Sequence, residues 1–319
     1  MVKFATDQNR TCYIFESGTY AFTSGVRQWI GLIQTHDVTP NMNVMQIRYQ
    51  GSTDRNVNDF ADGTQEWNGT FTYYPQDWKF LGYAIGSIQD YTGSHIFTEN
   101  NSDDRVQVSN NPLYHFTMED SKLSLTGSNF IRTLVGGMVD SYQINYSQGE
   151  IVSAEVGYIA QNETLGSGAV TSLAATTTKP YVFNNVRLEI PKGTYVDNLR
   201  EGTFRINNNL ERGHYLNGSR IAKELLPMNR DYESTATCVM DRDNAKLLYE
   251  NYYTLGSEFN AHLSIWGVAG SVDILMSGCK MTDMTVPSPL EGVQEQSFTF
   301  VPSNVYATAY DSIAKYNLD

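Results

Sequence analysis

Few residues of this chain have the types and spacing that enzyme chemistry requires. The chain has five histidines, His36, His95, His115, His214 and His262, and three cysteines, Cys12, Cys238 and Cys279. The histidines form no HExxH or HxH pattern and the cysteines form no CxxC pair, so neither set predicts a metal site. We expect the cysteines to be ordinary buried thiols. Glycine-rich phosphate loops and the GxSxG nucleophile turn are also missing, so the sequence predicts no catalytic residue and no cofactor.

Two acidic segments resemble active sites only superficially. Asp241, Asp243 and Asn244 are spaced like the start of a calcium loop, but the glycine and the distal glutamate of such a loop do not follow. Helix capping is the better interpretation of these three residues. Asp103 and Asp104 would suit glycoside hydrolysis only if two carboxyl groups lay about 5 to 9 Å apart in a cleft. Adjacent carboxylates in a polar segment favour a solvated turn, so a hydrolase is the weakest alternative.

Composition and charge limit the partners of the chain. Its 319 residues are 40% apolar and 18% charged, which predicts a globular protein with a sizeable core. The formal net charge of −13 opposes a tight hold on nucleic acid, because such binding depends on Lys and Arg displacing counterions. No apolar run reaches the length of about 18 residues that a membrane helix needs, so we expect no membrane partner.

Alternation of apolar and polar residues predicts a mainly β fold. The clearest strand patterns cover residues 43–49, 69–74, 151–159, 181–190, 262–268 and 293–301. Two short helices are predicted between strands, one after Pro75 in PQDWKFLGYAIG and one in DRDNAKLLYENYYTLG.

The two halves of the chain match each other in order. Residues 136–160 can be laid without gaps on residues 278–302, with 142 added to each number (278 − 136 = 142) and apolar positions kept. Further upstream, residues 70–81 match residues 237–248 at an offset of 167 (237 − 70 = 167). The small, polar segment 163–179 has the composition of a linker. These features predict a duplicated unit of a strand, a short helix and a long hairpin.

Residues 202–230, GTFRINNNLERGHYLNGSRIAKELLPMNR, resemble the tail tube proteins of long-tailed phages and archaeal tailed viruses. The matching positions are the turn at 207–211, the Gly-Ser-Arg segment at 218–220 and the following strand DYESTATCVMD; the first half resembles the same family through residues 69–87. The resemblance implies two tandem β-sandwich or barrel domains, each with a short flanking helix. We expect an N-terminal arm at 1–42, a first tube domain at 43–162, a linker at 163–179 and a second tube domain at 180–319.

The resemblance also implies a structural, non-enzymatic role in the virion tail. Rings of single-domain members contain six subunits, so three copies of a duplicated chain are expected to close one pseudo-hexameric ring. Stacked rings would enclose a conduit through which viral DNA passes without specific binding. The expected partners are other copies of the chain and the tape-measure and tail terminator proteins, with assembly in the host cytoplasm.

Two sets of residues are the candidates for contacts. We expect the arm to mediate ring stacking, with Cys12, Tyr13, Trp29 and Ile30 as its interface residues. The polar faces of the two equivalent strands, Ser153 with Glu155 and Glu295 with Ser297 and Thr299, are the candidates for the channel wall, where negative charge would repel DNA. The alternative is that these five residues form a solvated outer face.

Two other functions remain open at this point. One is the inner tube of a contractile tail or injection machine, which has a related fold. The other is a carbohydrate-binding β-sandwich, which the aromatic and asparagine content would suit. Trp67, Trp78 and Trp266 stand in regular apolar patterns, however, and for these three we expect core packing.

Overall fold

The computed structural model describes residues 4–16, 27–49, 56–57, 59–99, 113–124, 128–167, 178–240, 246–268, 270–287, 293–313 and 316. The strands are β1 (Phe4–Glu16), β2 (Leu32–Asn41), β3 (Met45–Ile47), β4 (Asp59–Ala61), β5 (Glu66–Tyr74), β6 (Ser87–Tyr91), β7 (Ser94–Thr98), β8 (His115–Ser124), β9 (Phe130–Ser147), β10 (Ser153–Ala160), β11 (Asn162–Gly166), β12 (Val186–Glu189), β13 (Leu199–Asn207), β14 (Leu210–Gly213), β15 (Glu224–Pro227), β16 (Asp231–Val239), β17 (Phe259–Gly267), β18 (Gly270–Thr285), β19 (Glu295–Val301) and β20 (Asn304–Tyr310). The helices are α1 (Lys79–Ile85), the 3-10 helix η1 (Phe183–Asn185) and η2 (Leu248–Thr254), which is π-helical. The chain is mainly β, as the alternating pattern predicts.

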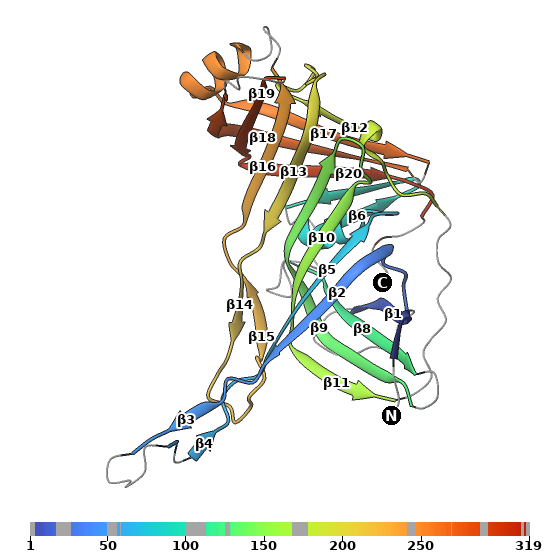
Figure 1. Cartoon of the computed structure of the whole chain (residues 1–319), viewed down its shortest axis with the longest axis vertical. Helices are drawn as coiled ribbons and strands as arrows, with labels where there is room; N and C mark the ends of the chain where they lie inside the picture. The colour runs from blue at the N-terminus through green and yellow to red at the C-terminus, as the bar shows by residue number, and fades with distance from the viewer. Residues whose placement is uncertain are drawn as a thin grey trace.

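The molecule is built on one antiparallel central sheet with the order β2-β5-β10-β9-β13-β16-β19-β18 (Figure 1). The long strands β9 and β18 each take part in two layers. Their C-terminal parts lie in the central sheet, whereas their N-terminal parts pair with β8 and β11, and with β17 and β20, respectively. Side chains between the layers form one large hydrophobic core.

The strand order of the central sheet repeats, because β2-β5-β10-β9 is followed by β13-β16-β19-β18. The pairing registers of the two long hairpins also repeat. Glu155 lies opposite Gln143, and Ser297 lies opposite Thr285, so both strands of the hairpin are related by 142 (297 − 155 and 285 − 143). Each hairpin also has a one-residue register shift, and the two shifts lie at equivalent places. The first lies between Gly157 and Tyr158 of β10, and the second lies between Thr299 and Phe300 of β19. The 142-residue offset found in the sequence therefore also relates the paired residues of the two hairpins.

The strand upstream of each long hairpin has an offset that differs from the expected one. Phe71 and Ala236 occupy equivalent positions, because they lie opposite Val156 and Phe298, and their numbers differ by 165 (236 − 71) rather than by the expected 167. For the helix the offset of 167 stays a prediction; Leu81 and Leu248, which it relates, are both buried (248 − 81 = 167). A shift of two residues keeps each side chain on the same face of a strand. The alternating pattern in the sequence therefore does not distinguish an offset of 165 from one of 167.

Aromatic side chains hold α1 against the sheets. Phe80 of this helix packs edge-on against Tyr13, Phe71 and Phe116, with ring centroids 5.0, 5.1 and 5.6 Å away. Each such pair adds about 1 kcal/mol beyond the burial of its apolar area. Every residue of α1 from Phe80 to Ile85 is buried, which explains why so short a helix is stable.

Three segments differ from the sequence expectations. The segment expected as an irregular arm contains β1, which pairs with β8, and β2, which is an edge strand of the central sheet. The expected linker begins inside β11, which pairs with β9, and its residues 168–177 lie outside the described part of the chain. The strand expected at 181–190 is interrupted by η1. β1, β2 and β11 are regular because each pairs with another strand of the chain.

Candidate functional site

One face of the central sheet is lined mainly by small polar and acidic side chains. A row of opposed residues crosses five neighbouring strands, from Ser153 through Asn145, Thr203 and Thr235 to Thr299. The hydroxyl groups of Thr203 and Thr235 are hydrogen-bonded at 2.8 Å, which ties β13 to β16 on this face. We call this surface the polar face.

All five residues expected at the channel wall lie on the polar face. Glu155 and Ser297 are exposed, and Ser153, Glu295 and Thr299 are half-buried. The residues that alternate with them point into the core: Ala154, Val156, Gln296, Phe298 and Phe300 are buried. The structure therefore brings together, on one continuous surface, residues from two strands that are distant in the sequence.

The polar face carries more carboxylates than cationic groups, although Arg205 lies on it opposite Glu233. Glu155, Glu201 and Glu233 are exposed there, and in the described part of the chain none of them forms an ion pair. Glu295 differs, because its carboxylate lies 2.9 Å from the Arg200 guanidinium. An acidic surface of this kind repels phosphate groups.

The central sheet ends in two edge strands. Within the described residues, β2 pairs only with β5, and the C-terminal part of β18 pairs only with β19. Unpaired edges expose a row of backbone N–H and C=O groups that can pair with another chain. The edges are therefore candidate contact sites.

Two β-hairpins project from one end of the central sheet, β3–β4 farther than β14–β15 (Figure 1). They contact each other, because Gln65 N–H donates to the Arg220 carbonyl at 2.8 Å and the Arg220 guanidinium lies 2.9 Å from the Asp62 carboxylate. Large apolar side chains are exposed on and beside the β3–β4 hairpin, namely Val44, Met45, Ile47, Tyr49 and Phe60. Exposed apolar groups gathered in this way are typical of a protein contact.

Three of the four residues expected to mediate stacking are core residues instead. Cys12, Tyr13 and Ile30 are buried within the subunit, so they cannot contact a neighbouring copy in this conformation. Burial also raises the pKa of the Cys12 thiol to about 12. Trp29 is half-buried, and its indole N–H donates to Gln76 Oε1 at 2.9 Å. The sequence could not show this, because the pairing of β1 with β8 spans about a hundred residues.

The other tryptophans divide in a similar way. Trp67 and Trp78 are buried, as their patterns predict, but Trp266 is exposed. Its ring lies beside the Arg187 guanidinium, which also stacks on Tyr195 at 4.4 Å. The expectation of core packing is therefore wrong for Trp266, because an outer strand exposes one face to solvent.

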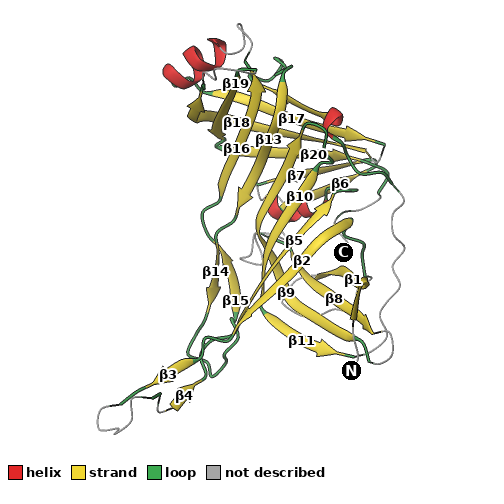
Figure 2. Ribbon diagram, viewed as in Figure 1, coloured by secondary structure: helices red, strands yellow, loops and turns green. Residues whose placement is uncertain are grey.

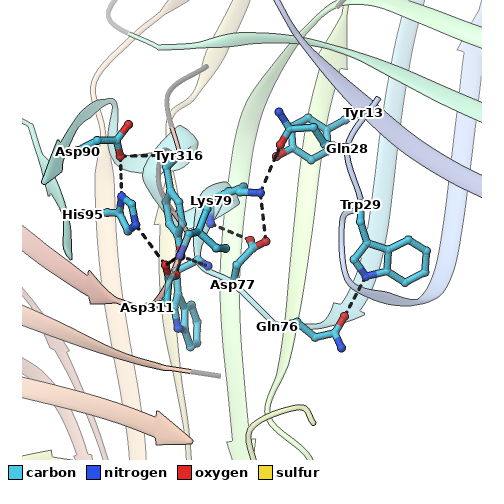
Figure 3. A network of polar contacts seen from close by, with 12 residues as sticks. Tyr13, Gln28, Trp29, Gln76, Asp77, Lys79, Asp90, His95, Asp311 and Tyr316 are labelled. Carbon is cyan, nitrogen blue, oxygen red and sulfur yellow. Dashed lines mark hydrogen bonds and ion pairs between the residues drawn. The ribbon is translucent and has the colours of Figure 1, made fainter. Parts of the chain in front are cut away.

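A buried network of polar groups connects the two halves of the chain (Figure 3). His95 Nδ1 lies 2.6 Å from Asp90 Oδ1, and its Nε2 lies 3.2 Å from Asp311 Oδ1. The imidazole stacks on Tyr316, whose hydroxyl bonds to Asp311 and accepts the Trp78 backbone N–H at 3.1 Å. The network therefore attaches the residues after β20 to the β6–β7 hairpin of the first half.

The charges in this network shift two pKa values in opposite directions. Burial alone would lower the pKa of His95, but the hydrogen bonds to Asp311 and Asp90 outweigh it and raise the pKa. Burial alone would raise the pKa of Asp311, but the hydrogen bonds from His95 and Tyr316 outweigh it and lower the pKa. The imidazolium and the carboxylates thus stabilise each other.

Replacing His95 with glutamine is expected to lower the free energy of unfolding by about 3 kcal/mol near pH 6, because two buried carboxylates lose their cation. The raised pKa of His95 gives stabilisation that is complete below the unfolded-state value of about 6.5 and is lost as the pH rises through the folded-state pKa. Denaturant unfolding of both proteins from pH 5 to pH 9 should therefore show a difference that shrinks at alkaline pH.

His262→Gln is the matched control for this experiment. His262 also lies between two carboxylates, 3.4 Å from Glu189 and 3.3 Å from Asp273, but its side chain is partly exposed. We expect an effect below about 1 kcal/mol for this substitution. Equal losses for the two variants, or a difference independent of pH for His95→Gln, would contradict the role of the buried imidazolium.

No arrangement of catalytic groups emerges among the described residues. His36 Nε2 lies 2.8 Å from the Tyr158 hydroxyl and its Nδ1 lies 3.8 Å from Asp120, which resembles a triad. Burial raises the pKa of Tyr158 far above its ordinary value, however, so this hydroxyl is not an activated nucleophile. Within the described part of the chain, no three His, Cys, Asp or Glu side chains are placed to hold a metal ion, and no helix is long and apolar enough to cross a membrane.

Two comparisons with known proteins bear on the family of this chain. A search of curated proteins finds no significant match. The model of the family described as phage tail tube protein matches residues 37–302, which include most of the central sheet and both projecting hairpins. The match covers well over half of the chain, and the chain therefore belongs to the phage tail tube protein family.

Proposed function

We propose that this chain is the major tail tube subunit of a tailed virus and that its copies join side by side through their sheet edges. In this arrangement the C-terminal part of β18 in one copy pairs with β2 of the next copy. One observation carries the proposal: the pairing of β9 with β13 inside the chain already joins two equivalent four-stranded units. The junction between copies repeats that internal junction.

The internal junction predicts the register between copies. Inside the chain, Gln143 of β9 lies opposite Arg205 of β13. The β18 equivalent of Gln143 is Thr285, because the two hairpins are related by 142. The β2 equivalent of Arg205 is Thr39, because these residues lie opposite Glu233 and Asn68, which are related by the strand offset of 165 (233 − 68). Thr285 of one copy therefore faces Thr39 of the next.

Repetition of this junction closes a ring. Each chain supplies two equivalent units, and we propose that three chains make a pseudo-hexameric ring whose central sheets form one barrel. Closure pairs the edge of β2 and the edge of β18, which would otherwise promote uncontrolled association. We treat the two units as tandem tube domains, extended by the β6–β7 hairpin, which belongs to the first half of the chain but pairs through β7 with β20.

The other surfaces suit the remaining contacts of a tube. The polar face, with its unpaired carboxylates, lines the conduit and lets DNA slide without specific binding. The apolar side chains of the β3–β4 hairpin contact the next ring, which assigns stacking to this hairpin instead of the buried residues of β1. Tape-measure and terminator proteins would meet the lumen and the end of the tube, in tails assembled in the host cytoplasm.

Cysteine cross-linking tests the proposed register. A Thr39→Cys, Thr285→Cys protein is expected to form disulfide-linked oligomers on oxidation, since opposed residues of an antiparallel pair lie within disulfide range. The native cysteines are buried and should not compete. Electron microscopy should show rings or tubes with an open centre, and native mass spectrometry should show three chains in each ring.

The matched control is Val38→Cys with Thr285→Cys. Moving one residue along β2 places the thiol on the opposite face of the sheet, so this pair should remain reduced. Equal cross-linking of both pairs would contradict the register, and a protein that remains monomeric at every salt and protein concentration would contradict the tube assignment itself.

A further inference from the structure

The two helices that occupy equivalent positions in the repeated units differ in their surroundings. In α1, every residue from Phe80 to Ile85 is buried. In η2, Leu248 is buried, but Tyr249 and Tyr253 are exposed, as is Leu255 just after it. The rings of Tyr249 and Tyr253 lie 5.8 Å apart and form an aromatic surface. We call these three exposed residues the η2 surface.

Part of this difference has a local cause. The β6–β7 hairpin covers α1 at Gly82, where a side chain would lie 2.8 Å from Ile88 and 3.0 Å from Phe97. The second unit has no equivalent hairpin, because η2 ends at Thr254 and β17 begins at Phe259. Among the described residues, no hairpin therefore covers that side of η2.

The junction inside the chain covers another part of α1. The Asn208 side-chain amide donates to the Ala84 carbonyl at 3.1 Å and to the Val139 carbonyl at 3.0 Å. Asn208 follows β13 directly, is almost fully buried and also accepts the Arg230 Nε–H at 2.7 Å. The corner after β13 thus seals the C-terminal end of α1 against β9.

We infer that η2 is a second contact between neighbouring copies and that its surface packs against Met42 at the corner after β2 of the next copy. The inference rests on the proposed function, because the pairing of β18 with β2 brings that corner to η2. Asn207 and Asn41 are equivalent, since they lie opposite Asp231 and Glu66 (231 − 66 = 165), so the residue equivalent to Asn208 is Met42.

The position of η2 agrees with this contact. The helix packs on β18, whose C-terminal edge is the one to which the next copy would add. Figure 2 shows η2 at the end of the molecule beside β18 and β19, away from the internal junction. A copy added to β18 in the internal register therefore places its β2 corner next to η2.

The side chains on the two sides are complementary. Inside the chain the corner residue is an asparagine, which hydrogen-bonds to the backbone of a fully covered helix. Between copies the corner residue is an exposed methionine, and the helix presents two tyrosine rings and Leu255. A thioether packs well against aromatic rings, whereas it could not replace the hydrogen bonds of Asn208.

Oxidative footprinting of the cross-linked rings tests the contact. Hydroxyl radicals and mass spectrometry would compare the reduced monomer with single rings closed by the Thr39→Cys, Thr285→Cys disulfide. We expect Met42, Tyr249 and Tyr253 to react at least about threefold more slowly in the ring, because reactivity falls with solvent exposure. Tyr195 is the internal control that should keep its rate, since it is exposed and lies between β12 and β13, outside the proposed contact.

A double substitution tests the energetic role of the same surface. Tyr249→Ser with Tyr253→Ser should leave the melting temperature of the monomer unchanged and raise the protein concentration needed for ring formation about tenfold, as for loss of an interface anchor. Tyr195→Ser is the control and should assemble like the unmodified protein. A rise in the required concentration for the double variant, with none for Tyr195→Ser, supports η2 as an interface.

The outcomes separate this inference from the proposed function. If the disulfide forms but Met42 and the two tyrosines react equally in ring and monomer, the η2 contact is wrong and the edge pairing stands. If the double variant also assembles at the unmodified concentration, the same conclusion follows. If neither the disulfide nor rings form, the edge pairing is wrong, and the η2 contact is overturned with it.

Discussion

Tubes whose subunits carry Glu155→Lys and Glu201→Lys are expected to hold double-stranded DNA, which the unmodified tube should let pass. Both carboxylates are exposed on the polar face and lie opposite uncharged residues, Thr72 and Gln143 for Glu155, and Ser147 and Thr237 for Glu201. Each substitution replaces a negative charge with a positive one. Six new lysines per ring of three chains would displace counterions, and binding should fall by about 10³ between 50 and 200 mM salt.

The rate of DNA ejection from virions, measured at several salt concentrations, checks this expectation. Ejection should be slowed at low salt and restored at high salt, because screening weakens the attraction. Glu295 is left unchanged on purpose, since its replacement would also break the ion pair with Arg200.

The control carries the same kind of charge reversal on an exposed loop residue, Asp197→Lys. Ejection from these virions should match that of the unmodified virus. If the variant in Glu155 and Glu201 ejects DNA at the unmodified rate under all conditions, the polar face does not line the conduit, while the edge pairing remains open to its own test.

Gly202→Val is expected to destabilise the subunit by about 3 kcal/mol, because the junction between the two units has no room for a side chain. Gly202 of β13 lies opposite Tyr146 of β9. A Cβ atom at this position would lie 2.5 Å from the Tyr146 hydroxyl and 2.6 Å from the Thr235 carbonyl oxygen, which is closer than real contacts allow. The Thr235 carbonyl oxygen belongs to the backbone of β16 and the Tyr146 ring belongs to β9. Relief of the clash therefore requires β13 to separate from one of these two strands.

Thermal or denaturant unfolding measures this effect, and a fall of about 5 °C in the melting temperature corresponds to the expected loss. Thr203→Val is the control, because Thr203 points to the polar face and loses only its hydrogen bond to Thr235. That change should cost less than about 1 kcal/mol.

A double-mutant cycle identifies the cause of the loss. Tyr146→Ala removes one of the two obstructions, so Gly202→Val should cost less in that background than in the unmodified protein. Additive losses would show that the tyrosine ring is not the obstacle, and a Gly202→Val protein as stable as the unmodified one would contradict the close packing at the junction.

The local pattern of the chain determined several features by itself. Alternating residues predicted the β content, and they placed Ser153, Glu155, Glu295, Ser297 and Thr299 on the face opposite the buried residues, where the structure has them. The relation between the two long hairpins could also be read from the sequence, because a repeat of apolar positions keeps its spacing when the pairing repeats. These features depend on neighbours in the chain, so a linear pattern contains them.

The tertiary structure alone decided which strands are neighbours. Tyr13, in a segment expected to be an arm, is buried because β1 pairs with β8, whereas Trp266, in a regular apolar pattern, is exposed because β17 belongs to an outer sheet. Likewise, Tyr316 stacks on His95, which no local signal indicates. A periodic pattern indicates that one face of a segment is buried, but contacts with other parts of the chain decide which partner buries it. The sheet edges of β2 and β18, on which the proposed assembly depends, are therefore visible only once the whole chain is folded.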